Sequence, residues 1–177
     1  MFEDDDGADP AVIAAFESQI KTTLFEGLKK ITSLMNQDSL TLFPVSIERY
    51  VSFVAFVVNS YARDVIEIFE NGADTSLGLL LIDQLLHIAV QSEATVAQSS
   101  LRTIESLCES YWRLRLHQKV PIINSTLVQK MQEVSSKLLE WVVSSFLSSE
   151  GQRSAVLDRF DALGATLLAI TRLSPER

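Results

Sequence analysis

Residues 74–116 read DTSLGLLLIDQLLHIAVQSEATVAQSSLRTIESLCESYWRLRL, and they indicate the architecture of the chain most clearly. Its first half opens with residues that can cap a helix and stays largely apolar to about Val90. A short turn at Gln91 and Ser92 leads into a second helix, from Glu93 to about Leu116. Two helices joined by so short a turn must lie antiparallel, so the stretch predicts a helix hairpin. The second helix carries an apolar stripe at helical spacing, made up of Ala97, Leu101, Ile104, Cys108 and Tyr111.

Helical spacing continues on the N-terminal side of this hairpin. Asp9 and Pro10 form a start signal for a first helix that runs to about Met35. A second helix is predicted from Ser46 to about Glu70, although its apolar run at residues 51–58 could also form a strand. We reject the strand because the rest of the chain offers it no partner and the helical spacing holds through the run.

On the C-terminal side, Ser125 or Asn124 can cap a fifth helix to about Leu147, and a sixth runs from about Arg153 to Leu173. The sequence therefore predicts an all-α fold of about six helices, paired as three antiparallel hairpins. We expect a HEAT-like segment of an α-solenoid, and a closed helical bundle is the alternative. Residues 1–8 are interpreted as a short acidic leader and residues 9–174 as the helical-repeat domain.

Composition and charge narrow the function. A length of 177 residues fits one domain with a core of its own. The single cysteine and the acidic first residues, unlike a signal peptide, indicate an intracellular chain. A net charge of -8 repels the phosphates of nucleic acids and anionic lipids. No charge-free apolar run reaches the length of a membrane span. We therefore expect protein partners, with no direct nucleic-acid contact and no membrane span.

No catalytic or metal-binding pattern stands out. The only two histidines, His87 and His117, lie on different predicted helices. The motifs of metalloproteases, serine hydrolases and phosphate-binding loops are absent from the sequence. Cys108 belongs to the apolar stripe and is interpreted as a core residue, and His87 as a partly buried, hydrogen-bonded one. We predict a protein that is not an enzyme and needs no cofactor and no metal.

The string from Leu79 to Ala89, the turn residues Ser92 and Glu93, and a helix ending in ESYWRL at residues 109–114 carry a resemblance. In this order they are similar to nuclear transport receptors of the karyopherin-β family, in particular the transportin-SR and importin-thirteen branch. Those receptors have a Leu-rich outer helix, a short turn and an inner helix that ends in two aromatic residues followed by Arg-Leu. The order of elements is similar over about residues 45–170.

The resemblance implies a segment of a nuclear import receptor, present in the cytoplasm and the nucleus. Its fourth and sixth helices would line a concave side that binds basic cargo or the small GTPase Ran. Arg102, Glu109 and Arg113, on the polar face of the fourth helix, would pair with charges of the partner. Trp112 would be an aromatic anchor, or else would pack between repeats. The alternative function is a structural helical subunit of a larger assembly; the sequence leaves the oligomeric state open.

Overall fold

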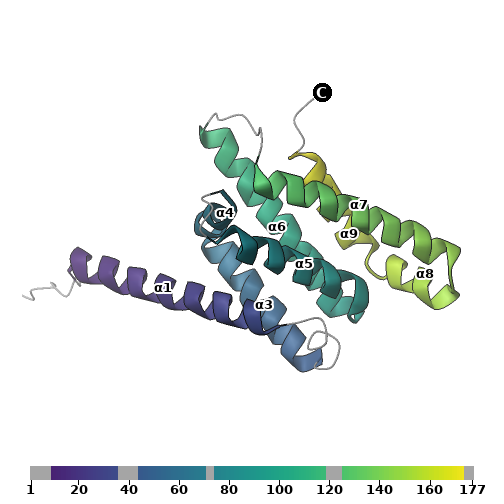
Figure 1. The fold of residues 1–177 in the computed structure, drawn as a ribbon, viewed down its shortest axis with the longest axis horizontal. Coiled ribbons are helices and arrows are strands. Elements are labelled where there is room, and N and C mark those ends of the chain that lie inside the picture. The colour runs from purple at the N-terminus through teal and green to yellow at the C-terminus, as the bar shows by residue number, and fades with distance from the viewer. Residues whose placement is uncertain (1–8, 36–43, 71–73, 119–124, 174–177) are drawn as a thin grey trace, which may run out of the picture.

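The computed structural model describes residues 9–35, 44–70, 74–118 and 125–173. Every regular element in these ranges is a helix, which confirms the all-α fold class. The predicted acidic leader at residues 1–8 lies outside them. The helices, labelled as in Figure 1, are α1 (Pro10–Leu34), α3 (Pro44–Ser60), α4 (Ala62–Glu70), α5 (Thr75–Gln91), α6 (Ala94–Gln118), α7 (Thr126–Leu147), α8 (Glu150–Leu157) and α9 (Phe160–Thr171).

Two helix starts are fixed by the side chains that were predicted to cap them. The Asp9 carboxylate accepts a hydrogen bond of 2.9 Å from the backbone N–H of Ala11, at the start of α1. The Ser125 hydroxyl accepts one of 3.3 Å from the N–H of Val128, at the start of α7. The apolar run at residues 51–58 lies wholly within α3, so rejecting a strand there was correct.

The predicted helix from Ser46 to Glu70 is divided, and its continuity was therefore wrong. α3 ends at Ser60 and α4 begins at Ala62, with a bend at Tyr61. Backbone hydrogen bonds from Tyr61 to Val57 and from Val65 to Tyr61 continue through the bend, at 2.9 and 3.0 Å. Apolar spacing is the same on both sides of such a bend, so the sequence pattern does not reveal it.

The predicted sixth helix is also divided, into α8 and α9, and Arg159 lies between them. This side chain is 5% exposed. Its guanidinium donates one hydrogen bond of 2.6 Å to the carbonyl of Ala155 and another to the carbonyl of Ser92, in the turn between α5 and α6. It also lies 5.6 Å from the centre of the Trp141 ring on α7. The break in the helix places Arg159 where it can join these three elements.

The central helix of the fold is α6, which packs against α3, α4, α5 and α9. One layer contains α3, α6 and α9, and the other contains α1, α5 and α7; α4 and α8 lie beside them. Figure 1 shows α1 at one end of the molecule and α7, α8 and α9 at the other. The N-terminal half of α1 extends away from the body, and every residue from Pro10 to Ile20 is exposed.

A buried polar link joins α1, α3 and α5. Gln84 of α5 is 4% exposed, and its side-chain amide donates to the carbonyl of Thr32, at 2.8 Å, and to the carbonyl of Met35. The amide oxygen of Gln84 accepts a hydrogen bond from the Tyr50 hydroxyl of α3. One side chain therefore satisfies the last carbonyls of α1 and a buried tyrosine.

The packing of α4 on α5 depends on a glycine. A Cβ atom added to Gly78 would lie 2.7–2.9 Å from three ring atoms of Phe69. We expect Gly78→Ala to lower the free energy of unfolding by about 1–3 kcal/mol, as overpacked cores do. Gly164 of α9 is the matched control, because its added Cβ meets no atom within 4 Å. Gly164→Ala should stabilise the protein by about 0.5–1 kcal/mol. Urea denaturation measures both, and equal effects would contradict the role of Phe69.

Candidate protein-binding surfaces

The polar face of α6 brings together three of the four predicted site residues. Arg102 is exposed on this face. Further along the same helix, the Arg113 side chain is 72% exposed. Glu109 lies between them and forms an ion pair of 3.1 Å with Arg113, four residues away. Such an exposed pair on one helix contributes only about 0.3–0.5 kcal/mol to stability. A partner that offers better geometry can therefore separate it at little cost.

Trp112 lies apart from these three residues. It is half-buried and packs against the hydrophobic core, while Arg102 and Arg113 face outward. This position favours packing between helices over the role of an exposed anchor for a partner.

Sequence reasoning missed an aromatic residue beside this surface. Asn59 of α3 accepts a hydrogen bond of 2.6 Å from the Ser106 hydroxyl, which joins α3 to the polar face of α6. Phe56, almost one turn before Asn59, is 53% exposed. Local pattern does not reveal this exposure, because α3 is apolar on nearly all sides and only its neighbours determine which side chains are covered. Phe56 is thus the exposed aromatic near the polar face.

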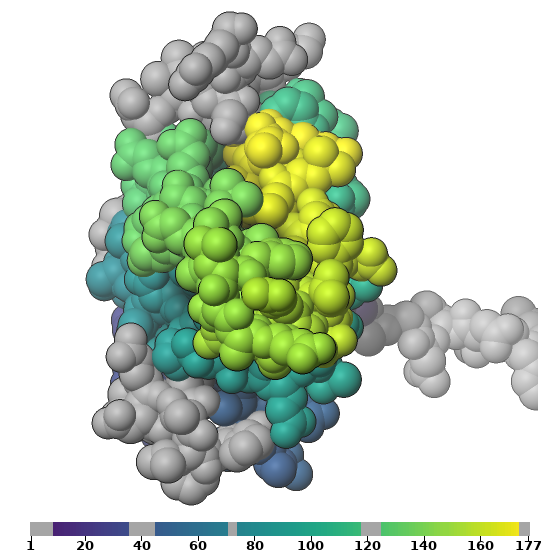
Figure 2. All heavy atoms as spheres, turned by 90° about the vertical axis from the view of Figure 1, so that its right-hand side faces the viewer, coloured from purple at the N-terminus to yellow at the C-terminus, as the bar shows by residue number. Residues whose placement is uncertain are grey.

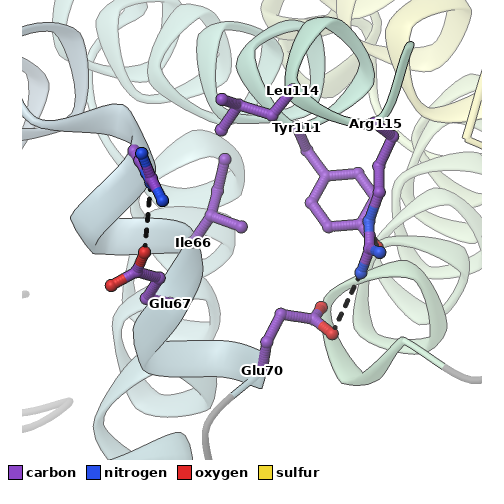
Figure 3. A pocket seen from close by; sticks show the side chains of 7 residues that line it. Ile66, Glu67, Glu70, Tyr111, Leu114 and Arg115 are labelled. Atoms are coloured by element: carbon purple, nitrogen blue, oxygen red, sulfur yellow. Dashed lines mark hydrogen bonds and ion pairs between the residues drawn. The ribbon is translucent and has the colours of Figure 1, made fainter. Parts of the chain in front are cut away.

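A pocket of about 210 Å³ between α4 and α6 holds a cluster of charged groups. The guanidinium of Arg115 donates to the Tyr111 hydroxyl at 3.0 Å and pairs with Glu70 at 3.3 Å, and it lies 5.0 Å from the centre of the Tyr111 ring. Figure 3 shows Glu70 and Arg115 directed toward each other. Glu70 also accepts a hydrogen bond from Ser125, the cap of α7. These polar and charged groups already bond to one another, so their contacts in the pocket hold the helices together.

A longer groove follows the line between α5 and α7. Two adjoining hollows of about 560 and 420 Å³ share Val90, Gln91 and Trp141. His87 lines one of them, and its buried Nε2 atom has no hydrogen-bond partner among the described residues, unlike the bonded histidine that the sequence predicted. Lys130 of α7 forms an ion pair of 2.7 Å with Asp83 of α5, which joins the two helices. Burial works against the charged lysine, but its hydrogen bonds to Asp83 and Glu133 outweigh burial and raise the pKa of Lys130.

The remaining candidates for chemistry are separated. Cys108 is fully buried, as predicted, and burial raises the pKa of its thiol to about 12. His87 and His117 lie on α5 and α6. The described residues contain no group of three or more His, Cys, Asp or Glu side chains placed to hold a metal ion. No single described helix has the length and apolar composition to cross a membrane. α4 and α5 have that length and composition only when they are counted together, and the pair is bent by 116° at the break between them.

Comparison of the chain with known protein families, with curated proteins and with solved structures finds no match.

Proposed function

We propose that this protein is a non-catalytic, protein-binding helical scaffold, built as a HEAT-like α-solenoid segment. The observation that supports it is the order of helix contacts. α1 and α3 pack against α5 and α6, and these in turn pack against α7 and α9. Among the described residues, α1 makes at most sparse contact with α7 or α9. A closed bundle needs its first and last helices to meet around one core, whereas a solenoid unit touches only its neighbours.

In this arrangement the chain consists of three stacked hairpins: α1 with α3, α5 with α6, and α7 with α9. The layer formed by α3, α6 and α9 presents Arg102, Glu109, Arg113 and the exposed ring of Phe56. Charged groups beside an aromatic side chain are typical of binding surfaces in which arginine and aromatic anchors carry most of the affinity. We assign partner binding to this face, which we call the α6 face.

The resemblance to karyopherin-β receptors makes the proposal more specific. The partner would be a basic cargo protein or the small GTPase Ran, and the protein would act in the cytoplasm and the nucleus. The net charge of -8 supports a basic partner, because complementary charge steers association.

The test is an affinity capture of partners from cell extract, with and without GTP-loaded Ran, read by mass spectrometry. We expect the wild-type chain to capture basic proteins that Ran releases. The variant Glu109→Arg should bind those proteins at least about tenfold more weakly, because it replaces the acidic group of the α6 face with a cation that repels a basic partner. Glu150→Arg on α8 is the matched control, since Glu150 is exposed outside the α6 face.

If the partners bind Glu109→Arg as well as they bind wild type, the α6 face is excluded as the binding surface. If the same proteins are captured with and without GTP-loaded Ran, the role of a nuclear transport receptor is excluded. The more general proposal of a protein-binding scaffold would then stand.

A structural subunit of a larger assembly is the second candidate function. It is favoured by the large apolar side chains that stay exposed at both ends of the fold, among them Phe16 on α1 and Phe160 on α9, at 62% and 64%. A subunit of this kind should be recovered from cells in one fixed complex that does not change with Ran. The two candidates are therefore separated by the same capture experiment.

A further inference from the structure

The last hairpin carries an apolar surface that no described residue covers. On α7, the exposed apolar side chains recur at intervals of four and three residues, which places them on one side of the helix. Further ones follow on α8 and α9, and Figure 2 views the molecule from this end, where these three helices fill the front. We call the set the C-terminal face; its members, each 44–64% exposed, are Leu139, Val143, Phe146, Leu157, Phe160 and Leu168.

The first hairpin carries a second surface of this kind. Leu28 and Thr32 bury one side of α1, and a stripe of exposed apolar residues runs along an adjacent side for most of the helix. Glu17 is the single charged residue between Pro10 and Ile20, so this part of the helix is also nearly free of charge. We call the stripe the N-terminal face; its members, each 37–66% exposed, are Ile13, Phe16, Ile20, Ile31 and Leu34.

A glycine within the C-terminal face indicates what covers it. Gly164 lies on α9 midway between Phe160 and Leu168, four residues from each, and no atom would lie within 4 Å of an added Cβ. A glycine in the middle of a helix weakens that helix, and it is useful where another backbone must approach closely. No described part of the chain makes that approach. The outer side of α9 is therefore open to the close approach of another backbone at Gly164.

The order in which the hairpins stack within the chain indicates which surface can pack on the C-terminal face. The middle hairpin, α5 with α6, packs one side against α1 and α3 and its other side against α7 and α9. We call the side of a hairpin that packs on the preceding hairpin its leading side, and the side that packs on the following hairpin its trailing side. Each covered surface is thus a leading side packed on a trailing side. The C-terminal face is a trailing side and the N-terminal face is a leading side. Among the described residues, these are the two sides that no other hairpin covers.

We propose that copies of this chain associate head to tail, with the N-terminal face of one copy packed on the C-terminal face of the next. Six half-exposed apolar side chains supply on the order of 500 Å² of apolar surface, the larger part of the roughly 800 Å² that each partner buries in a stable interface. The two surfaces differ, so the contact does not close on itself and the assembly grows with protein concentration. The proposal rests on the stacked hairpins of the proposed scaffold and on the two exposed apolar faces, and it does not depend on cargo or on Ran.

Light scattering and sedimentation velocity of the full chain test the proposal. We expect the mass to rise above the 19.7 kDa of one chain as the concentration is raised through the micromolar range. The tail variant, Gly164→Gln with Leu168→Glu, blocks the C-terminal face. The head variant, Ile13→Glu with Phe16→Glu, blocks the N-terminal face. Each of these four positions is exposed, so both variants should keep the wild-type circular dichroism spectrum.

Mixing the two variants gives the decisive result. Each variant alone should stay at the mass of one chain. The equimolar mixture should form a complex of two chains, because the intact head of the tail variant can still bind the intact tail of the head variant. The control is Leu116→Glu, at a 57% exposed position on α6 of the middle hairpin, and it should assemble as wild type does.

A wild-type chain that stays monomeric at every concentration would overturn the proposal. A variant that still dimerises alone would overturn it too, since a symmetric contact between like surfaces is blocked in only one of the two variants. Capture of basic partners by the head and tail variants reports on the α6 face separately. Failure of assembly and failure of the proposed scaffold function are thus distinguished.

Discussion

Replacing Gln84 with leucine should lower the free energy of unfolding by at least about 3 kcal/mol. The substitution leaves the carbonyls of Thr32 and Met35 and the hydroxyl of Tyr50 without the partner that they share. A buried polar group without a partner costs about 1–3 kcal/mol, and three groups are affected at once. Urea denaturation followed by circular dichroism measures the loss.

The double variant Gln84→Leu, Tyr50→Phe separates the hydrogen bonds from packing. Removing the tyrosine hydroxyl as well should recover part of the loss, because the phenylalanine ring has no polar atom to satisfy. The recovered free energy is the coupling between the two side chains in a double-mutant cycle. A loss that is additive for the two substitutions would show that the link contributes little beyond packing.

The second large effect is a loss of stability at alkaline pH. Burial raises the pKa of the Cys108 thiol from 9.0 to about 12, with Glu105 adding to the rise, and raises the pKa of Tyr50 from 10.0 to about 12. Both groups ionise earlier in the unfolded chain, so both favour folding below pH 9 and lose that contribution as the pH rises toward 12. By about pH 11 the combined loss is on the order of 4 kcal/mol.

Denaturation curves at a series of alkaline pH values measure this loss. Cys108→Ala is the control, because it removes the group that ionises first in the unfolded state. This variant starts from a lower stability, since it loses buried packing, but its stability should stay nearly flat between about pH 9 and 10. A wild-type curve as flat as that of the variant would mean that the thiol is not held protonated.

Local sequence signals predicted the parts of the fold that depend on nearby residues. Asp9 and Ser125 cap the helices that they were expected to cap, since capping needs only the residue and the N–H groups of the next turn. Cys108 is buried at its place in the apolar stripe of α6. The bend at Tyr61 escaped prediction, because apolar spacing continues through it and the contacts of α4 with α5 and α6 set its direction.

The candidate site was predictable to the same extent. The polar face of α6 follows from spacing along one helix, and the structure places Arg102 and Arg113 on it as exposed residues. Phe56 could not be foreseen in the same way, since its exposure depends on where α1 and α6 lie around α3. Nothing in the local sequence separates the exposed stripe of α1 from an ordinary core stripe. Only the absence of a described neighbour makes that distinction.

The contact between Arg159 and the carbonyl of Ser92 has a consequence for the order of folding. The two residues are 67 positions apart along the chain, whereas the hydrogen bond from Arg159 to Ala155 spans only 4. Closing a long loop costs more conformational entropy than closing a helical turn, so distant contacts form after local ones. The turn between α5 and α6 must be in place before Arg159 can bind it. We therefore expect the C-terminal helices to fold against a surface that the middle of the chain has already formed.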